Sequence, residues 1–244
     1  MNITPEQLKR EQQIMEELKK FDTPSITNVV ATYPNDDNCL GLYHPWNGDW
    51  YTDQTCKCMF PELGRLCGYA VTCEYALPDP FYSRGTNVGD VFNAILASPK
   101  PVILVVKQSL PEKIKNRNGL LGGNMMTAFK NAGIVGAISD GPSRDIDEIR
   151  ALGLQYMLTG TTAGHGDFSL VGLNEPVTVC GMQVRTGEII HMDENGAVKF
   201  PREYLEEVLI RVRRLHEKEA DMQARLAVAK TGAEVDAIVH GEYK

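Results

Sequence analysis

The twelve residues IVGAISDGPSRD, at positions 134–145, decide the fold of this 244-residue chain. Ile134–Ser139 is a compact strand of small and β-branched side chains. The next residues, 140–143, predict a turn at the carboxyl end of that strand, and a helix is expected over 145–152. A strand that passes through a turn into a helix is the repeating unit of an α/β fold.

The same order of elements precedes this stretch. Residues 68–73 and 101–106 are short apolar runs that predict strands, the second of them buried on both faces. Residues 89–96 between them have the periodicity of a helix. Another helix is expected to open at Gly122-Gly123 and to end at Ala132-Gly133. The first half of the chain therefore predicts alternating strands and helices.

The second half predicts antiparallel strands. Residues 156–159 and 177–180 are strand candidates. Two further strands, 187–192 and 196–200, are expected to form a hairpin around residues 193–195. These strands add antiparallel sheet to the α/β core.

Helices are expected at both ends of the chain. Thr4 and Pro5 predict the start of an amphipathic helix over 4–20, and residues 21–25 start a second helix. Residues 33–53, rich in Pro, Asn, Gly and Asp, predict an irregular loop. The tail from Pro201 predicts a long amphipathic helix, because one stripe of it is apolar: Leu205, Val208, Leu209, Val212 and Leu215.

Composition excludes several classes of protein. Hydrophobic residues make up 43% of the chain and charged residues 23%, which is typical of a folded globular protein. The net charge of -7 provides no basic surface for nucleic acid. No apolar run approaches the roughly 18 residues of a membrane-spanning helix, and the first residues do not resemble a signal peptide. We expect a cytoplasmic protein whose six cysteines are reduced.

Arg144 and Asp145 are the first candidate site residues. They follow a strand end, where α/β sheets bind their ligands. A guanidinium can hold a carboxylate through two hydrogen bonds, and a carboxylate offers hard oxygens to a divalent cation. The pair suits a 2-keto acid. It also suits an ordinary helix start, where Asp complements the helix dipole.

Glycines supply the second candidate. Gly122, Gly123, Asn124 and Met125 open a helix, so their backbone N–H groups could bind an anion. The alternative is an ordinary glycine turn. His165 lies in another glycine-rich loop, from which it could approach a site, although a surface histidine is the safer interpretation.

The order of these motifs resembles the RraA-like family. The glycine-opened helix, residues 132–136, Asp140-Gly141, Arg144-Asp145 and Gly160-Thr161 carry the resemblance, which covers roughly residues 21–226. It implies a swivelling β/β/α domain over 21–201, with an N-terminal helix over 1–20 and a C-terminal helical extension over 202–244. It also implies a homotrimer, or a dimer of trimers, with active sites between subunits.

The resemblance also implies roles for individual residues. Asp145 resembles the ligand of Mg²⁺ or Mn²⁺, Arg144 the residue that binds the substrate carboxylate, and residues 122–125 the backbone amides of the keto-acid pocket. Glu219 resembles a glutamate that reaches a neighbouring subunit's site, although a solvated helix face explains it equally well. Gly123 stands where the family usually has an acidic residue.

The function implied is that of a metal-dependent lyase. Cleavage of a small 2-keto acid would proceed through a pyruvate enolate, as in a 4-hydroxy-4-methyl-2-oxoglutarate aldolase or an oxaloacetate decarboxylase. The alternative is a non-catalytic regulatory or interaction protein on the same fold, which Gly123 favours. A methyltransferase would need a glycine-rich cofactor loop after an early strand, and the sequence has none.

Overall fold

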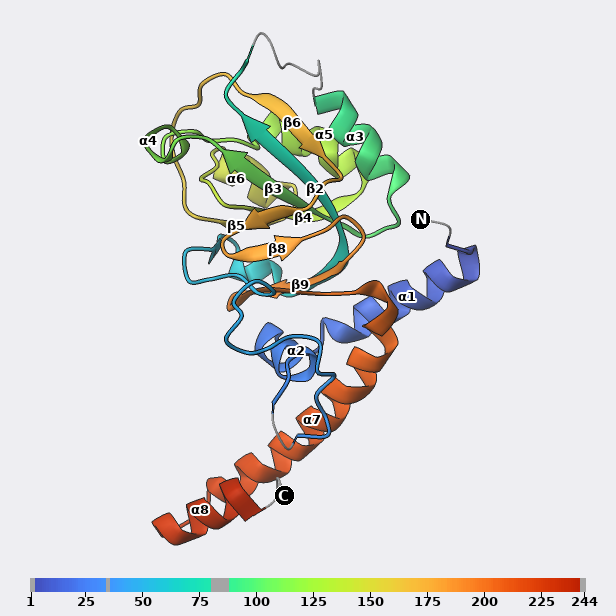
Figure 1. Ribbon diagram of the computed structural model, residues 1–244, viewed down its shortest axis with the longest axis vertical. Coiled ribbons are helices and arrows are strands. Elements are labelled where there is room, and N and C mark those ends of the chain that lie inside the picture. The colour runs from blue at the N-terminus through green and yellow to red at the C-terminus, as the bar shows by residue number, and fades with distance from the viewer. Residues whose placement is uncertain (1–2, 34–35, 80–87, 242–244) are drawn as a thin grey trace.

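The computed structural model describes residues 3–33, 36–79 and 88–241 (Figure 1). Residues 34 and 35 of the expected 33–53 loop, and both chain ends, therefore lie outside the described part. The helices are α1 (Pro5–Leu18), α2 (Thr23–Val30), α3 (Val88–Ala97), α4 (Glu112–Lys115), α5 (Gly123–Ala132), α6 (Ile146–Ala151), α7 (Leu205–Leu226) and α8 (Gly232–Gly241). The strands are β1 (Lys57–Cys58), β2 (Leu66–Ala76), β3 (Val102–Ser109), β4 (Ile134–Ser139), β5 (Gln155–Leu158), β6 (Ser169–Leu173), β7 (Val177–Val179), β8 (Met182–Val184), β9 (Ile189–Asp193) and β10 (Gly196–Phe200).

A mixed sheet organises the molecule, with strand order β1-β5-β4-β3-β2-β9-β10 and β6 beside β2. Strands β2, β3, β4 and β5 are parallel neighbours, as the alternation of strands and helices predicts. The other strands are antiparallel, including the predicted β9–β10 hairpin. The long strand β2 pairs with β9 through its first residues and with β6 through its last residues.

The parallel strands are covered on both faces, which explains their apolar sequence. Val102, Leu104 and Val106 of β3 face helices α3, α5 and α6, whereas Ile103 and Val105 face the hairpin of β7 and β8. This alternation follows from the two-residue period of a strand. The chain therefore has the expected layers, with a small β-hairpin on one face of the sheet and helices on the other.

Helices α1, α2 and α7 pack together against the part of the sheet formed by β9 and β10. Leu18 of α1, Val29 of α2, and Val208 and Val212 of α7 share one buried cluster with residues of β9 and β10. Thr4 caps α1 and Pro5 is its first residue, as the sequence predicts, and the side chain of Gln7 completes a capping box. The division of the chain into three segments stays a prediction.

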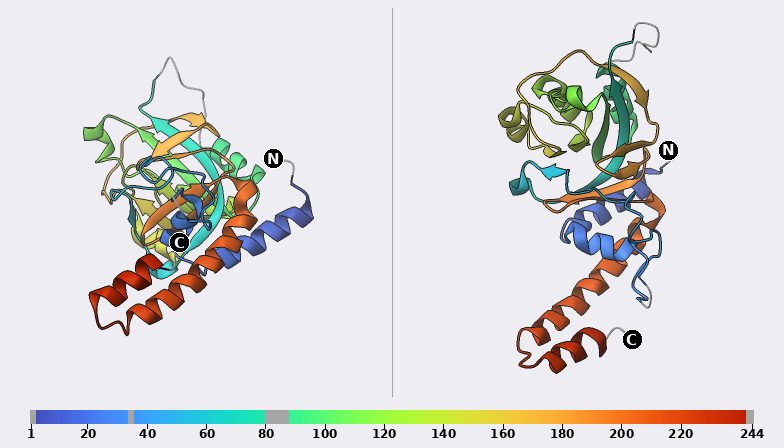
Figure 2. Two further views of the ribbon diagram at one scale, coloured as in Figure 1. Left: turned by 60° about the horizontal axis from the view of Figure 1, so that its bottom comes forward. Right: turned by 60° about the vertical axis from the view of Figure 1, so that its left-hand side comes forward.

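The tail differs from the single long helix that was expected. A 3-10 helix over Arg202–Tyr204 leads into α7, which begins at Leu205 and ends at Leu226, and α8 follows after a short turn. Figure 2 shows α7 leading away from the sheet and α8 turning back beside it. The buried stripe of α7 ends at Leu215, so the later turns of this helix have no sheet to cover. No helix within the described residues has the length and apolar character needed to cross a membrane.

Candidate active site

A pocket of about 510 Å³ opens where the turn after β4 meets the start of α5. Four segments form it: the loop before α5, the turn that leads into α6, the loop around His165, and the first residue of α3. Its lining residues are Val88, Gly119, Leu121, Gly122, Asn124, Met125, Arg144, Asp145, Glu148, His165 and Phe168. The pocket lies beyond the carboxyl ends of the parallel strands, where ligands of α/β proteins bind.

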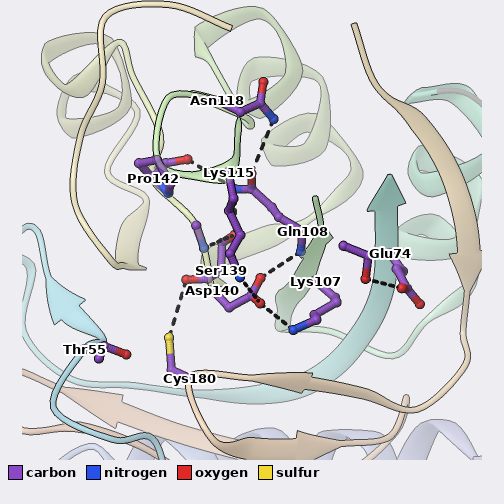
Figure 3. Close-up of polar contacts among 12 residues, drawn as sticks. Thr55, Glu74, Lys107, Gln108, Lys115, Asn118, Ser139, Asp140, Pro142 and Cys180 are labelled. Atoms are coloured by element: carbon purple, nitrogen blue, oxygen red, sulfur yellow. Dashed lines mark hydrogen bonds and ion pairs between the residues drawn. The ribbon is translucent and has the colours of Figure 1, made fainter. Parts of the chain in front are cut away.

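Asp140 anchors the turn that carries Arg144 and Asp145 (Figure 3). Its buried carboxylate accepts hydrogen bonds from Lys107 Nζ at 2.6 Å, from Lys115 Nζ at 3.1 Å and from the backbone N–H of Gln108 at 2.7 Å. Two ammonium groups and one amide compensate the burial of this charge. The end of β4 is thereby fixed to the end of β3.

Gln108 holds the same turn from its other side. Its Nε2 group donates to Ser139 Oγ at 3.1 Å and to the carbonyl of Pro142 at 3.2 Å (Figure 3). A Cβ atom at Gly141 would lie 2.4 Å from Gln108 Nε2, so only glycine allows this approach. The turn is therefore fixed by side chains that the sequence does not single out.

The loop before α5 is held in a strained conformation. Leu121 has φ = 63°, which is unusual for a residue with a branched side chain. Its carbonyl accepts hydrogen bonds from the hydroxyl of Tyr156 and, at 3.2 Å, from Ser143 Oγ. These buried hydroxyls stabilise the conformation that directs Gly122 and Gly123 toward the pocket.

Asp145 joins the two halves of the pocket. It caps α6 with φ = 60°, and its Oδ2 accepts a hydrogen bond of 2.9 Å from the N–H of Gly123. Arg144 Nε lies 3.5 Å from the same oxygen. A Cβ atom at Gly122 would lie 2.6 Å from Asp145 Oδ2 and 3.0 Å from Arg144 Nε. Gly122 therefore makes room for both charged groups.

Arg144 has donors available for a ligand. Its side chain is 35% exposed, and it donates no hydrogen bond to any residue of the described part. Its Nε atom is shielded from solvent and has no hydrogen-bond partner. Asp145 Oδ2 lies 3.5 Å away, close enough for an ion pair, but the arrangement of the two groups is not that of a hydrogen bond. A guanidinium whose N–H groups make no hydrogen bonds can bind the carboxylate of a ligand.

The structure brings together most of the predicted site residues. One pocket is lined by Gly122, Asn124, Met125, Arg144 and Asp145. Gly123 is not a lining residue, but its N–H donates a hydrogen bond to Asp145. Glu219 does not line this pocket of its own chain. It lies on α7, where burial, and then the nearby Asp22, raise the pKa of its carboxyl group. Its predicted role toward a neighbouring subunit stays a prediction.

The pocket also contains residues that sequence reasoning did not place there with preference. His165 was considered as a possible site residue, with a surface histidine as the safer interpretation; it is exposed, and it also lines the pocket. Glu148 was not considered, although it follows Asp145 by three residues and such residues share one side of a helix. The three-residue spacing between Asp145 and Glu148 could have indicated that Glu148 lies in the pocket.

The donor groups suit a hard divalent cation. Mg²⁺ keeps several water ligands and binds proteins through one or two carboxylates, and Asp145 supplies a carboxylate to an open pocket. No group of three or more His, Cys, Asp or Glu residues that could hold a metal occurs in the described ranges. Asp145 is therefore the residue we expect to hold a mainly hydrated ion.

Comparisons with known proteins bear on the family and the fold of this chain. The RraA-like family model, described as Aldolase/RraA, matches residues 46–199. Protein DlpA of Legionella pneumophila is 28% identical over 153 residues, which are 59% of this chain and 23% of that protein. A protein of Halalkalibacterium halodurans named "Putative 4-hydroxy-4-methyl-2-oxoglutarate aldolase" is 30% identical over 144 residues, which are 59% of this chain and 65% of that protein. The matches thus span less than two thirds of either relative.

Solved structures share the fold. An uncharacterised protein of Pseudomonas syringae superposes with a TM-score of 0.70 at 19% identity, over 94% of each chain. RraAS2 of Streptomyces coelicolor, described as an unusual member of the RNase ES inhibitor RraA protein family, superposes with a TM-score of 0.63 at 19% identity. That match covers 87% of this chain and 96% of RraAS2.

Proposed function

Because the chain belongs to the RraA-like family, we propose that it is a divalent-metal-dependent lyase that cleaves a 2-keto acid next to its carbonyl group. One observation carries the proposal: the guanidinium of Arg144, which donates no hydrogen bond within the described part of the chain, and the carboxylate of Asp145 line the same pocket, at the start of a glycine-opened helix. A 2-keto acid presents a carboxylate and an adjacent keto oxygen, which match a guanidinium and a cation held beside it.

The residues of the pocket have separate tasks in this reaction. Arg144 binds the substrate carboxylate and orients the bond that breaks. Asp145 holds Mg²⁺ or Mn²⁺, and its own orientation depends on the N–H of Gly123. The cation, when bound, supplies an electron sink for the charge that develops on the keto oxygen. Charge grows as the bond breaks, so groups aimed at this oxygen stabilise the transition state more than the substrate.

Two reactions share the pyruvate enolate that results. Retro-aldol cleavage of a 4-hydroxy-4-methyl-2-oxoglutarate-type substrate and decarboxylation of oxaloacetate both leave it, and both end when the enolate takes up a proton. The name of the Halalkalibacterium halodurans relative supports the aldolase. A catalyst of either reaction exchanges the methyl protons of pyruvate with solvent.

The test is incubation with pyruvate and Mg²⁺ or Mn²⁺ in heavy water, with the methyl signal followed by NMR. We expect loss of the methyl proton signal at a rate that depends on protein and metal concentration. Chelation of the metal should stop the exchange. No exchange with either metal would contradict the lyase.

The second candidate is a non-catalytic regulatory protein. It is favoured by Gly123, because the resemblance implies an acidic residue at this position, and by the description of RraAS2. This candidate predicts no exchange with any metal, so the same experiment separates the two functions.

A further inference from the structure

The space above Gly123 is filled by a carboxylate from another element. A Cβ atom at this position would lie 1.8 Å from Glu148 Oε2 and 2.9 Å from Glu148 Cδ. Non-bonded atoms do not approach so closely, so no side chain at position 123 can coexist with this orientation of Glu148. The carboxylate of Glu148 occupies the place in which a side chain of residue 123 would begin.

The position of Glu148 follows from helix α6. Asp145 caps this helix, and Glu148 comes three residues later, so both side chains lie on the same side of it. Both line the pocket that also contains Arg144. The carboxylate of Glu148 thus lies at the first residue of the ten-residue helix α5, whose dipole favours negative charge at that end.

Glu148 has no structural partner for its charge. Its carboxylate makes no hydrogen bond or ion pair with any residue of the described part, and it remains exposed to the pocket. The preceding residue, Asp147, points away and pairs with Arg150 Nη1 at 2.8 Å. An unpaired carboxylate beside Arg144 and Asp145 is available for chemistry.

We propose that Glu148 supplies from α6 the acidic group that position 123 lacks, and that it carries the proton of the enolate step. This inference rests on the proposed lyase function. When pyruvate is activated, a methyl C–H bond breaks, its electron pair enters the enolate, and the proton passes through pocket water to the Glu148 carboxylate. In the forward retro-aldol reaction the Glu148 carboxylate accepts, through the same water, the proton of the C4 hydroxyl as the C3–C4 bond breaks and the C4 carbonyl forms. The resulting carboxyl group then gives a proton to the enolate carbon and becomes a carboxylate again.

The first test is Glu148→Gln, which keeps the shape of the side chain but cannot accept a proton at neutral pH. We expect proton exchange to fall by about 100-fold or more, the usual range for loss of a general acid–base group. Binding of Mn²⁺, measured by electron paramagnetic resonance, should change by less than about three-fold. Full exchange, or loss of Mn²⁺ binding, would overturn the proposal.

The second test moves the carboxylate back to position 123. Gly123→Asp combined with Glu148→Ala should recover at least a tenth of the parent rate, whereas Glu148→Ala alone should not. A double variant as inactive as Glu148→Ala would contradict the proposal. Asp147→Asn is the matched control on the same helix and should retain the parent rate.

The two proposals fail in different ways. If the parent protein exchanges no pyruvate protons, the lyase function is wrong. If the parent exchanges them and Glu148→Gln exchanges them equally fast, the lyase function stands and the role of Glu148 is wrong.

Discussion

The N–H of Gly123 donates a hydrogen bond of 2.9 Å to Asp145 Oδ2. This contact joins the start of α5 to the start of α6, the two segments that supply most of the pocket. It leaves the other oxygen, Oδ1, for a cation. The position of the predicted metal ligand therefore depends on a backbone group 22 residues away.

Asp145→Ala should abolish metal-dependent proton exchange and Mn²⁺ binding. The side chain is 31% exposed, so the loss of its hydrogen bond should lower the free energy of unfolding by only about 1 kcal/mol. Exchange assays, Mn²⁺ titration and urea unfolding measure these effects. Asp147→Ala, whose side chain is 98% exposed, is the control and should behave as the parent. Full exchange in Asp145→Ala would refute its role.

Gly122→Ala should inactivate the pocket without unfolding the protein. The added Cβ would lie 2.6 Å from Asp145 Oδ2, so both charged side chains must move. A displacement of about 1 Å can reduce a rate about 100-fold. The measurement is the exchange rate at saturating metal. Gly164→Ala is the control, since its Cβ would meet no atom within 4 Å, and an equal loss in both variants would argue against the steric explanation.

His191 should make the stability depend on pH between about 6.5 and 4. Burial lowers the pKa of His191 to about 4, despite the nearby Asp193. Its Nε2 lies 3.2 Å from the carbonyl of Leu18, so Nε2 carries the proton and Nδ1 accepts from Thr23 Oγ1 at 2.9 Å. Above pH 6.5 the neutral ring contributes its full stability. As the pH falls, the unfolded chain binds a proton that the folded chain does not, and up to about 3 kcal/mol is lost near pH 4.

Urea unfolding from pH 7.5 to pH 4.5 checks this expectation. His191→Gln should be less stable than the parent at pH 7.5 and should lose less stability on acidification. His240→Gln, at an exposed position, should keep the parent profile. A parent profile that stays flat between pH 6.5 and pH 5 would contradict a neutral buried ring.

Asp140→Asn should destabilise the fold and the site together. The amide cannot compensate the ammonium groups of Lys107 and Lys115, and removal of one partner from a buried ion pair costs about 3 kcal/mol. We expect a corresponding decrease in the free energy of unfolding, measured with urea. Exchange should also slow, because Asp140 anchors the turn of Arg144. Glu16→Gln, which breaks an exposed pair with Lys19, should cost less than about 0.5 kcal/mol; a similar cost in both variants would contradict the structural role of Asp140.

The amino-acid sequence by itself determined the local elements of this protein. The strand Ile134–Ser139, the glycine opening of α5, the capping box at Thr4 and the β9–β10 hairpin all have signals within a few residues of one another. Periodicity, capping and turn chemistry act over such distances, so they can be interpreted without the fold. The placement of Arg144 and Asp145 after a strand follows from the same local pattern.

Tertiary structure decided what depends on residues that are distant in the chain. Several contacts join segments that lie from 22 to more than 100 residues apart in the chain. They are the pairing of β2 with both β6 and β9, the packing of α1 against α7, and the hydrogen bonds from the hydroxyls of Ser143 and Tyr156 to the carbonyl of Leu121. The same is true of Glu148 above Gly123. The sequence shows that position 123 has no acidic side chain. Only the packing between α5 and α6 brings the Glu148 carboxylate to that position, because the contact between Glu148 and Gly123 depends on how the two helices meet on the sheet.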